Sequence, residues 1–181
     1  DLDPMDELGN YVLEMSSYQL DLTHSLAFDI ALLLNLSTDH LDRHGGMDGY
    51  ISSKKRIFSK QSNSHTAIVG VDDVFSRNVY GELKKIGLKS IIGISGEQPV
   101  PGGVYVHSGI LYDYTGEGPA EAIINLAQMP NLPGVHNAQN IAAAYATARI
   151  CGLEREAIIS GMVSFKGLAH RQELLAVIDG V

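Results

Sequence analysis

Residues capable of acid–base and metal chemistry gather just past a very apolar segment of this chain. Residues 35–44 contain Asp39 and His40, and Lys54 follows fourteen residues after His40. The apolar segment before them, residues 28–34, is typical of a buried strand in a parallel sheet. Ligands bind at the carboxyl ends of such strands in open α/β sheets. We therefore expect a functional site directly after this segment.

Polar side chains also lie near other predicted strand and helix ends. Glu14 lies in a short apolar stretch, where a carboxylate is costly unless it is paired or bound to a cation. Asn137 and Asn140 open an Ala-rich helix, and a helix N-terminus attracts phosphate or a nucleotide. The adjacent pair His170 and Arg171 lies in a predicted turn, where a guanidinium can hold phosphate oxygens.

Each of these residues also has a plain structural interpretation when it is taken alone. Glu14 could reach solvent at a strand end, His40 could be a packed histidine, and Asn137 could cap its helix. Lys54 begins a short basic run that could form a solvated helix face. As an ammonium Lys54 cannot bind Mg²⁺, which prefers hard oxygen donors, whereas a carbamylated lysine would carry a carboxylate.

The composition is that of an ordinary globular protein. The 181 residues are 45% hydrophobic and 19% charged, and the formal net charge of -8 argues against nonspecific binding to nucleic acid or to an anionic membrane. The single cysteine, Cys151, excludes an internal disulfide and favours a reducing, cytoplasmic compartment. No apolar run is long enough to span a bilayer.

The order of predicted elements indicates an α/β fold with a mostly parallel sheet flanked by helices. In its first part we predict strands at residues 11–15, 28–34, 66–70 and 89–94, and helices at 47–60 and 74–86, the last ended by Gly87. Short strands follow at 104–107, 110–114 and 122–126, typical of a small antiparallel subsheet. Helices are predicted at 133–150 and 154–163, and a last strand at 173–178.

Five motifs, in this order along the chain, resemble the Mur ligases. They are Glu14-Met-Ser-Ser-Tyr-Gln-Leu20, Asn35-Leu-Ser-Thr-Asp-His-Leu-Asp-Arg-His44, Tyr50-Ile-Ser-Ser-Lys-Lys-Arg-Ile-Phe58, His136-Asn-Ala-Gln-Asn140 and Gly167-Leu-Ala-His-Arg-Gln-Glu173. The Ser-Ser-Tyr-Gln run and the His-Arg pair are most similar to the family member that adds D-glutamate to UDP-N-acetylmuramoyl-L-alanine in peptidoglycan synthesis. The resemblance covers nearly the whole chain.

The resemblance implies a fold, a domain division and a reaction. It implies that residues 1–167 are a P-loop NTPase-like central domain that binds ATP, and that residues 168–181 are the hinge and first strand of a C-terminal domain. In the family, two Mg²⁺ ions assist transfer of the γ-phosphoryl group to the substrate carboxylate. The incoming amine, here that of D-glutamate, then attacks the acyl phosphate.

The resemblance also implies a role for each matching residue. Glu14 would hold one magnesium ion, and His40 and carbamylated Lys54 would support the second, so that Lys54 and His40 are the catalytic candidates. Ser16, Gln19 and Asp39 match positions near the UDP-sugar substrate. Asn137, Asn140, His170 and Arg171 match positions that contact ATP.

The chain also departs from the family pattern. It lacks the Gly-rich loop that ends in Gly-Lys-Ser/Thr, so we expect it to begin after that loop and to end just inside the third domain. We therefore expect this polypeptide alone to be inactive, to leave apolar surface uncovered at the sheet edge, and to self-associate. The alternatives are another Mur ligase, a folylpolyglutamate synthase-like ligase, or a noncatalytic binding module of the same fold.

Overall fold

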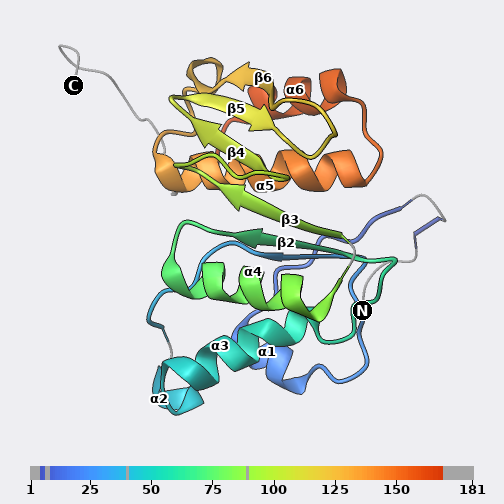
Figure 1. Ribbon diagram of the computed structural model, residues 1–181, viewed down its shortest axis with the longest axis vertical. Helices are drawn as coiled ribbons and strands as arrows, with labels where there is room; N and C mark the ends of the chain where they lie inside the picture. Colours follow the sequence, from blue (N-terminus) through green and yellow to red (C-terminus); the bar gives the residue numbers. More distant parts are fainter. Residues whose placement is uncertain (1–4, 7–8, 40, 89, 169–181) are drawn as a thin grey trace.

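The core of the molecule is one six-stranded sheet. The computed structural model describes residues 5–6, 9–39, 41–88 and 90–168. The strands are β1 (Ile30–Leu33), β2 (Thr66–Gly70), β3 (Ser90–Ser95), β4 (Val104–His107), β5 (Ile110–Asp113) and β6 (Glu121–Asn125). They lie in the sheet in the order in which they occur along the chain, so that β1 and β6 form the two edges (Figure 1).

The sheet changes from parallel to antiparallel at β4. The pairs β1–β2, β2–β3 and β3–β4 are parallel, whereas β4–β5 and β5–β6 are antiparallel. The predicted fold class is therefore confirmed, and the small antiparallel part continues the same sheet through β4. Because the parallel strands are in register, their carboxyl ends meet at one edge of the sheet.

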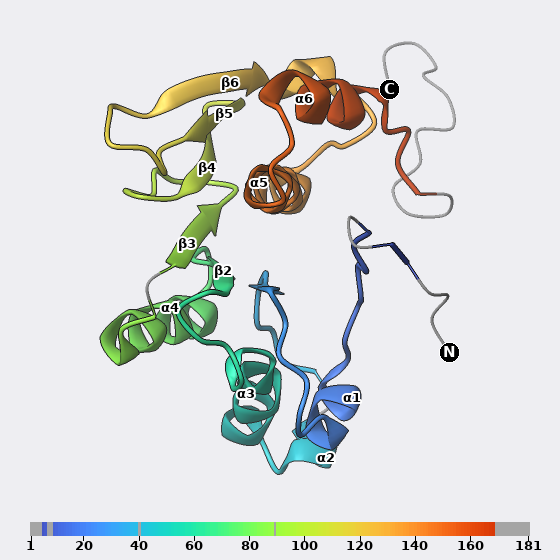
Figure 2. The ribbon, with the colours of Figure 1, turned by 90° about the vertical axis from the view of Figure 1, so that its right-hand side faces the viewer.

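Helices cover both faces of this sheet. They are α1 (Ser17–Leu22), α2 (Leu41–His44), α3 (Met47–Lys55), α4 (Val74–Ile86), α5 (Val135–Ile150) and α6 (Arg155–Ser164), with short 3₁₀ turns η1 (Arg56–Phe58) and η2 (Leu126–Gln128). Helix α5 packs on one face of the sheet and α4 on the other, with α3 beside α4 and α1 and α2 against α3 (Figure 2).

Alternating side chains on the parallel strands supply two hydrophobic cores. On β2, Ala67 and Val69 join the core that includes α4, whereas Ile68 joins the core that includes α5. Leu32 and Ile92 lie opposite Ile68 in the neighbouring strands, so a single apolar row crosses the parallel part of the sheet. The period of two between faces explains why these strands are apolar almost throughout.

Several predicted elements are confirmed at their bounds. The strand at Thr66–Gly70 and the helix at Val74–Ile86 occupy the predicted residues. Asp73 caps the helix by accepting hydrogen bonds from the backbone N–H groups of Phe75 and Ser76. Gly87 ends it in the left-handed conformation, which glycine adopts without strain. The capping residues Asp73 and Gly87 thus explain why α4 begins and ends where the sequence predicts.

Two predicted elements are wrong or too long. Residues 11–15 are not in a strand, because no described strand pairs with them and β1 is the edge of the sheet. The helix predicted at 47–60 ends at Lys55 and tightens into the turn η1, since the Ser59 N–H donates to the Arg56 carbonyl. The strand predicted at 173–178 lies outside the described residues.

Apolar side chains before α1 are open to solvent. The exposed fractions of Tyr11, Val12 and Leu13 are 47%, 95% and 44%. Among the helices that the structure describes, none combines the length and the apolar character needed to cross a bilayer.

Candidate functional site

A polar pocket of about 330 Å³ lies beside α1 and α3. The residues that line it are Glu14, Met15, Ser16, Ser17, Gln19, Asp39, Tyr50 and Lys54. Five of the predicted site residues, Glu14, Ser16, Gln19, Asp39 and Lys54, therefore lie around one cavity. His40 lies outside the described residues.

Helix α1 forms one wall of the polar pocket, and its first turn is a capping box. The Gln19 backbone N–H donates to Ser16 Oγ at 3.2 Å, and the Ser16 backbone N–H donates to Gln19 Oε1 at 2.9 Å. The Ser16 hydroxyl also donates to Gln19 Oε1, at 3.0 Å. This reciprocal arrangement fixes both side chains at the start of the helix.

Long-range hydrogen bonds hold α1 against the segment that carries Lys54. The buried Ser53 hydroxyl donates to the Ser17 carbonyl at 2.8 Å. The Arg56 guanidinium donates to the Leu20 carbonyl at 2.8 Å and to the Thr23 carbonyl at 3.0 Å. These contacts tie carbonyls of α1 and of Thr23 just after it to α3 and η1, and the Leu20 carbonyl also accepts from the Thr23 N–H.

His44 packs behind the polar pocket. Its side chain is 4% exposed, and its Nε2 lies 3.0 Å from the hydroxyl of Ser17. The imidazole ring also lies against the rings of Tyr18 and Tyr50, and its Nδ1 is 3.7 Å from a carboxylate oxygen of Asp21. His44 thereby joins α2 to both α1 and α3.

Tyr50 and Lys54 stand one turn apart on α3 and face the same pocket. The Lys54 Nζ atom lies 5.9 Å from the centre of the Tyr50 ring. Burial, and then the negative charge of Asp39, raise the pKa of the Tyr50 phenol. Asp39 therefore approaches the pocket closely enough for its charge to act on the residues of α3.

The donor set of the polar pocket suits a hard cation. Glu14 and Asp39 offer carboxylate oxygens, which Mg²⁺ prefers, and a carbamylated Lys54 would add another. Among the residues that the structure describes, no three His, Cys, Asp or Glu side chains are grouped closely enough to hold a metal. A metal at this position would therefore need carbamylated Lys54, phosphate or water oxygens, or His40 in addition.

A second, apolar cavity of about 780 Å³ lies between α5, α6 and the segment after α6. Asn137 and Asn140 line it, and Ile141, Met162 and Phe165 supply apolar walls. Asn137 does not cap α5, because the helix begins after Gly134, and its amide donates to the Pro133 carbonyl at 2.7 Å. His170 and Arg171 lie outside the described residues.

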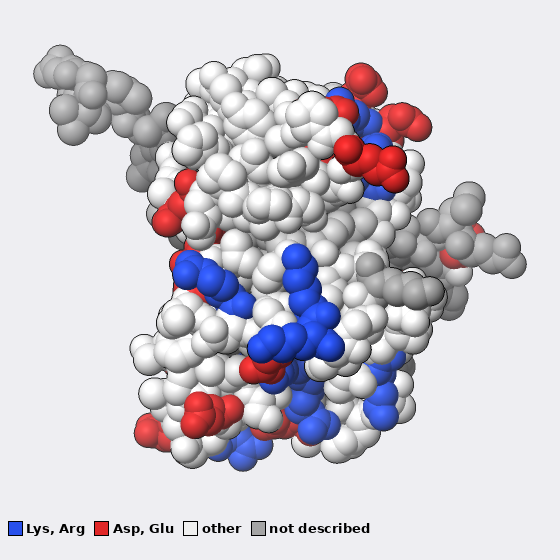
Figure 3. Space-filling model, in the orientation of Figure 1, with Lys and Arg blue, Asp and Glu red and all other residues white. Residues whose placement is uncertain are grey.

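Charged side chains outside the two pockets are spread over the surface of the molecule. On the face drawn in Figure 3, most basic side chains lie on the half that carries α3 and α4, and acidic side chains are interspersed with them. Lys55 of α3 forms an ion pair with Glu82 of α4, and Lys84 lies over the ring of Tyr80 at 4.6 Å. Lys54 therefore lines the polar pocket, whereas its neighbour Lys55 pairs with Glu82 on the outer surface.

Sequence reasoning missed three residues of the polar pocket or its support. Ser17 and Tyr50 line the pocket, and His44 holds Ser17 from behind. The spacing of Tyr50 and Lys54, four residues apart on a predicted helix, was a usable signal for Tyr50. No comparable local signal existed for His44, whose partners lie elsewhere in the sequence.

The fold agrees with a family comparison. The model of the Mur ligase middle domain matches residues 3–148, which is most of the chain. This chain therefore belongs to the Mur ligase middle-domain family.

Sequence identities to individual proteins show which members of the family this chain is similar to. The chain is 49% identical over 171 residues to the UDP-N-acetylmuramoylalanine--D-glutamate ligase of Caulobacter vibrioides, an alignment that covers 94% of this chain and 36% of that protein. It is 45% identical over 179 residues to the protein of the same name from Rhodospirillum rubrum, covering 99% and 37%. The chain thus spans little more than a third of the length of these relatives.

A solved structure supports the fold independently. The structure of a UDP-N-acetylmuramoyl-L-alanyl-D-glutamate--2,6-diaminopimelate ligase aligns with a TM-score of 0.64 and 24% identity, covering 87% of this chain and 32% of that one. At this identity the likeness concerns the fold alone.

Proposed function

We propose that this chain is the central, ATP-binding part of a cytoplasmic ligase that joins D-glutamate to UDP-N-acetylmuramoyl-L-alanine. The observation that carries the proposal is the polar pocket, in which Glu14, Asp39 and Lys54 surround one small cavity. Identities of 45–49% to ligases of that name support the choice of substrates.

The residues of the polar pocket suit phosphoryl transfer to a carboxylate. The substrate carboxylate attacks the γ-phosphorus of ATP and ADP leaves; the D-glutamate amine then attacks the acyl carbon and phosphate leaves. Bound Mg²⁺, two ions by analogy with the family, would stabilise the charge that develops on the transferring phosphoryl group. Glu14 and carbamylated Lys54 would hold these ions together with His40, while Ser16, Gln19 and Asp39 orient the UDP-sugar substrate.

The apolar cavity suits the base of the nucleotide. Its volume of about 780 Å³ is within the range of small-molecule sites, and it combines apolar walls with the amides of Asn137 and Asn140. Such amides can donate to and accept from the edge of a purine. We assign His170 and Arg171 to the phosphate end of the same nucleotide.

Replacement of Lys54 tests the role of the polar pocket. In the full-length ligase, Lys54→Ala should lower turnover by about 10²- to 10³-fold, because it removes a group that supports the transition-state charge. Lys55→Ala is the matched control, since Lys55 pairs with Glu82 outside the pocket and its loss should leave turnover within about twofold of wild type.

Equal turnover in Lys54→Ala and wild type would contradict the proposal and would favour a noncatalytic module of this fold. Amino-acid selectivity separates the proposed ligase from another Mur ligase or a folylpolyglutamate synthase-like enzyme. We expect the full-length protein to release phosphate with D-glutamate and not with diaminopimelate or lysine.

The 181 residues by themselves should not catalyse ligation. They contain no Gly-rich loop ending in Gly-Lys-Ser/Thr, whose amides and lysine cradle the β- and γ-phosphates. Release of ADP by the purified chain, dependent on both UDP-N-acetylmuramoyl-L-alanine and D-glutamate, would contradict this expectation.

The isolated chain should also self-associate. Strand β1 is an edge of the sheet, and Tyr11, Val12 and Leu13 expose apolar surface before α1. Open strand edges and apolar patches promote association between copies. Sedimentation velocity should show an average mass that rises with concentration, and a monomer at all concentrations would disprove this.

A further inference from the structure

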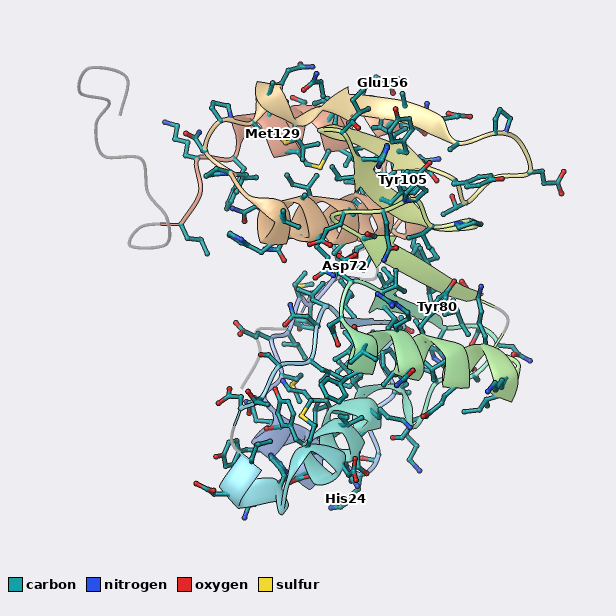
Figure 4. All side chains as sticks on the ribbon, turned by 60° about the vertical axis from the view of Figure 1, so that its left-hand side comes forward. His24, Asp72, Tyr80, Tyr105, Met129 and Glu156 are labelled. Carbon is teal, nitrogen blue, oxygen red and sulfur yellow. The ribbon has the colours of Figure 1, made fainter. Side chains whose placement is uncertain are left out.

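Asp72 is the centre of a hydrogen-bond cluster at the carboxyl edge of the sheet, beside α5 (Figure 4). Its Oδ2 atom accepts from the Gly96 backbone N–H and from the Gln139 side-chain amide, each at 2.8 Å. Its Oδ1 atom accepts from the hydroxyl of Ser95. One carboxylate therefore joins the residues that follow β2 and β3 to the first turns of α5.

Two glycines let α5 approach this edge closely. A Cβ atom at Gly70 would lie 1.8 Å from the Leu34 carbonyl oxygen and 2.8 Å from the Gln139 amide nitrogen, and one at Gly96 would lie 2.5 Å from the Val135 carbonyl oxygen. Neither side-chain atom would fit without moving the backbone. Gln139 can therefore reach Asp72 because the residues at the ends of β2 and β3, Gly70 and Gly96, have no side chains.

The Gln139 side chain is buried, which makes its partner important. Gln139 is 5% exposed and Ser95 is fully buried. A buried amide destabilises the fold unless its hydrogen bonds are made, and a bond to a carboxylate is among the stronger ones. The position of Gln139 is therefore set by Asp72.

Gln139 and the two asparagines occupy different faces of the same helical turn. Asn137 and Asn140 are three residues apart, so they project to the same side and line the apolar cavity. Successive residues turn by about 100° around a helix, which directs Gln139 away from them and toward the sheet. Any rotation of α5 that releases Gln139 from Asp72 also moves both asparagines.

We propose that Gln139 and Asp72 are positioning residues for nucleotide binding, holding the first turns of α5 so that Asn137 and Asn140 face the cavity. This inference rests on the proposed function, which assigns that cavity to ATP. Helix α5 has a second side-chain hydrogen bond to the sheet, from Tyr145 to Asp113 at 3.1 Å. That bond lies about two turns further along the helix and offers an internal comparison.

Kinetics of the full-length ligase test the proposal. Gln139→Met keeps the length of the side chain and removes its hydrogen bond, so the KM for ATP should rise about tenfold while kcat stays within about twofold. Tyr145→Phe removes the other bond from α5 to the sheet and should leave the KM for ATP unchanged. An unchanged KM in Gln139→Met, or an equal rise in both variants, would overturn the proposal.

A carboxylate at position 139 gives a second readout. In Gln139→Glu two carboxylates face each other, so the KM for ATP relative to wild type should be highest at alkaline pH and should fall as the pH is lowered, when the pair can share a proton. Gln139→Met should show no such pH dependence. If the KM for ATP of Gln139→Glu relative to wild type does not change with pH, the carboxylate at position 139 does not lie against Asp72 and the proposal fails.

A conservative replacement of Asp72 distinguishes loss of the hydrogen bond to Gln139 from a general loss of folding. Asp72→Asn keeps one oxygen for the Gln139 amide and should preserve the KM for ATP within about threefold, whereas Asp72→Ala should raise it as Gln139→Met does. If Asn140→Ala leaves the KM unchanged, the assignment of the cavity to ATP fails. If Asn140→Ala raises the KM and Gln139→Met does not, only the inference about positioning fails.

Discussion

The polar pocket and the apolar cavity are built in different ways. The walls of the polar pocket come from α1, α3 and the segments around them, joined by hydrogen bonds between residues 36 positions apart in the sequence. The apolar cavity lies mainly between α5 and α6, which follow each other along the chain, and α5 rests on a broad hydrophobic core. At the first site the α1 wall depends on a few directional contacts to the α3 side, whereas the second site depends on packing spread over many side chains.

This difference predicts unequal sensitivity to substitution. Removing one charged hydrogen-bond donor should loosen the wall that α1 forms, because this six-residue helix buries little beyond Ser17 and Leu20 and is held by its bonds to Ser53 and Arg56. A comparable change at the surface of α5 should leave the apolar cavity in place. Substitutions at Arg56, Ala144 and Tyr145 test this prediction.

The largest effect is expected at Arg56. Arg56→Met removes the bonds to the carbonyls of Leu20 and Thr23 and should lower the free energy of unfolding by about 2–3 kcal/mol. Arg149→Met is the matched control, since Arg149 is exposed and, among the described residues, its side chain donates to the nearby Leu153 carbonyl; its cost should stay below about 0.5 kcal/mol. Urea unfolding of the 181-residue chain measures both, and equal losses would refute the comparison.

An intermediate effect is expected from filling the apolar cavity. Ala144 lies on the exposed face of α5 that lines the cavity, so Ala144→Leu adds volume there without disturbing the core. In the full-length ligase the KM for ATP should rise about tenfold, with the unfolding midpoint unchanged within about 2 °C. A lower midpoint with an unchanged KM would mean that this face of α5 supports the fold and not the ligand.

The smallest effect is expected at Tyr145, within the core behind the cavity. Burial raises the pKa of the Tyr145 phenol, and the charge of Asp113 raises it further, while Arg155 opposes this. The unfolded chain then loses this proton at lower pH than the folded chain, so stability falls as pH rises above about 10.

Tyr145→Phe should cost about 1 kcal/mol at neutral pH and make the alkaline decline of stability less steep. The residual slope should come from Tyr50 and Tyr105, whose pKa values are also raised by burial. Urea unfolding of the chain at neutral and alkaline pH measures both effects. An unchanged alkaline slope in Tyr145→Phe would show that Tyr145 does not contribute to it.

The sequence predicted those elements whose signals are local. Helix α4 begins after Asp73 and ends at Gly87, and both end signals lie next to the helix itself. The stretch 11–15 has the apolar character of a strand, but a strand also needs a neighbour, and no local pattern specifies one. That prediction failed for this reason.

The candidate site was predictable to the same extent. Glu14, Asp39 and Lys54 were singled out by residue type and given roles by the resemblance to the Mur ligases, and the fold brings them around one pocket. The contact between Gln139 and Asp72 joins residues 67 positions apart, and His44 likewise meets partners from another segment. Contacts of this kind arise from tertiary packing, which periodicity and propensity do not encode.

The capping box of α1 has a consequence for recognition. The Ser16 hydroxyl proton is already directed to Gln19 Oε1, and one lone pair of Ser16 Oγ accepts from the Gln19 backbone N–H. A ligand acceptor at this wall would therefore replace Gln19 Oε1 as the partner of the hydroxyl and add no bond, whereas a ligand donor can use the second lone pair of Ser16 Oγ. A ligand acceptor at this point contributes little net affinity, because the capping box already satisfies the hydroxyl proton, so this wall favours ligands that present a donor.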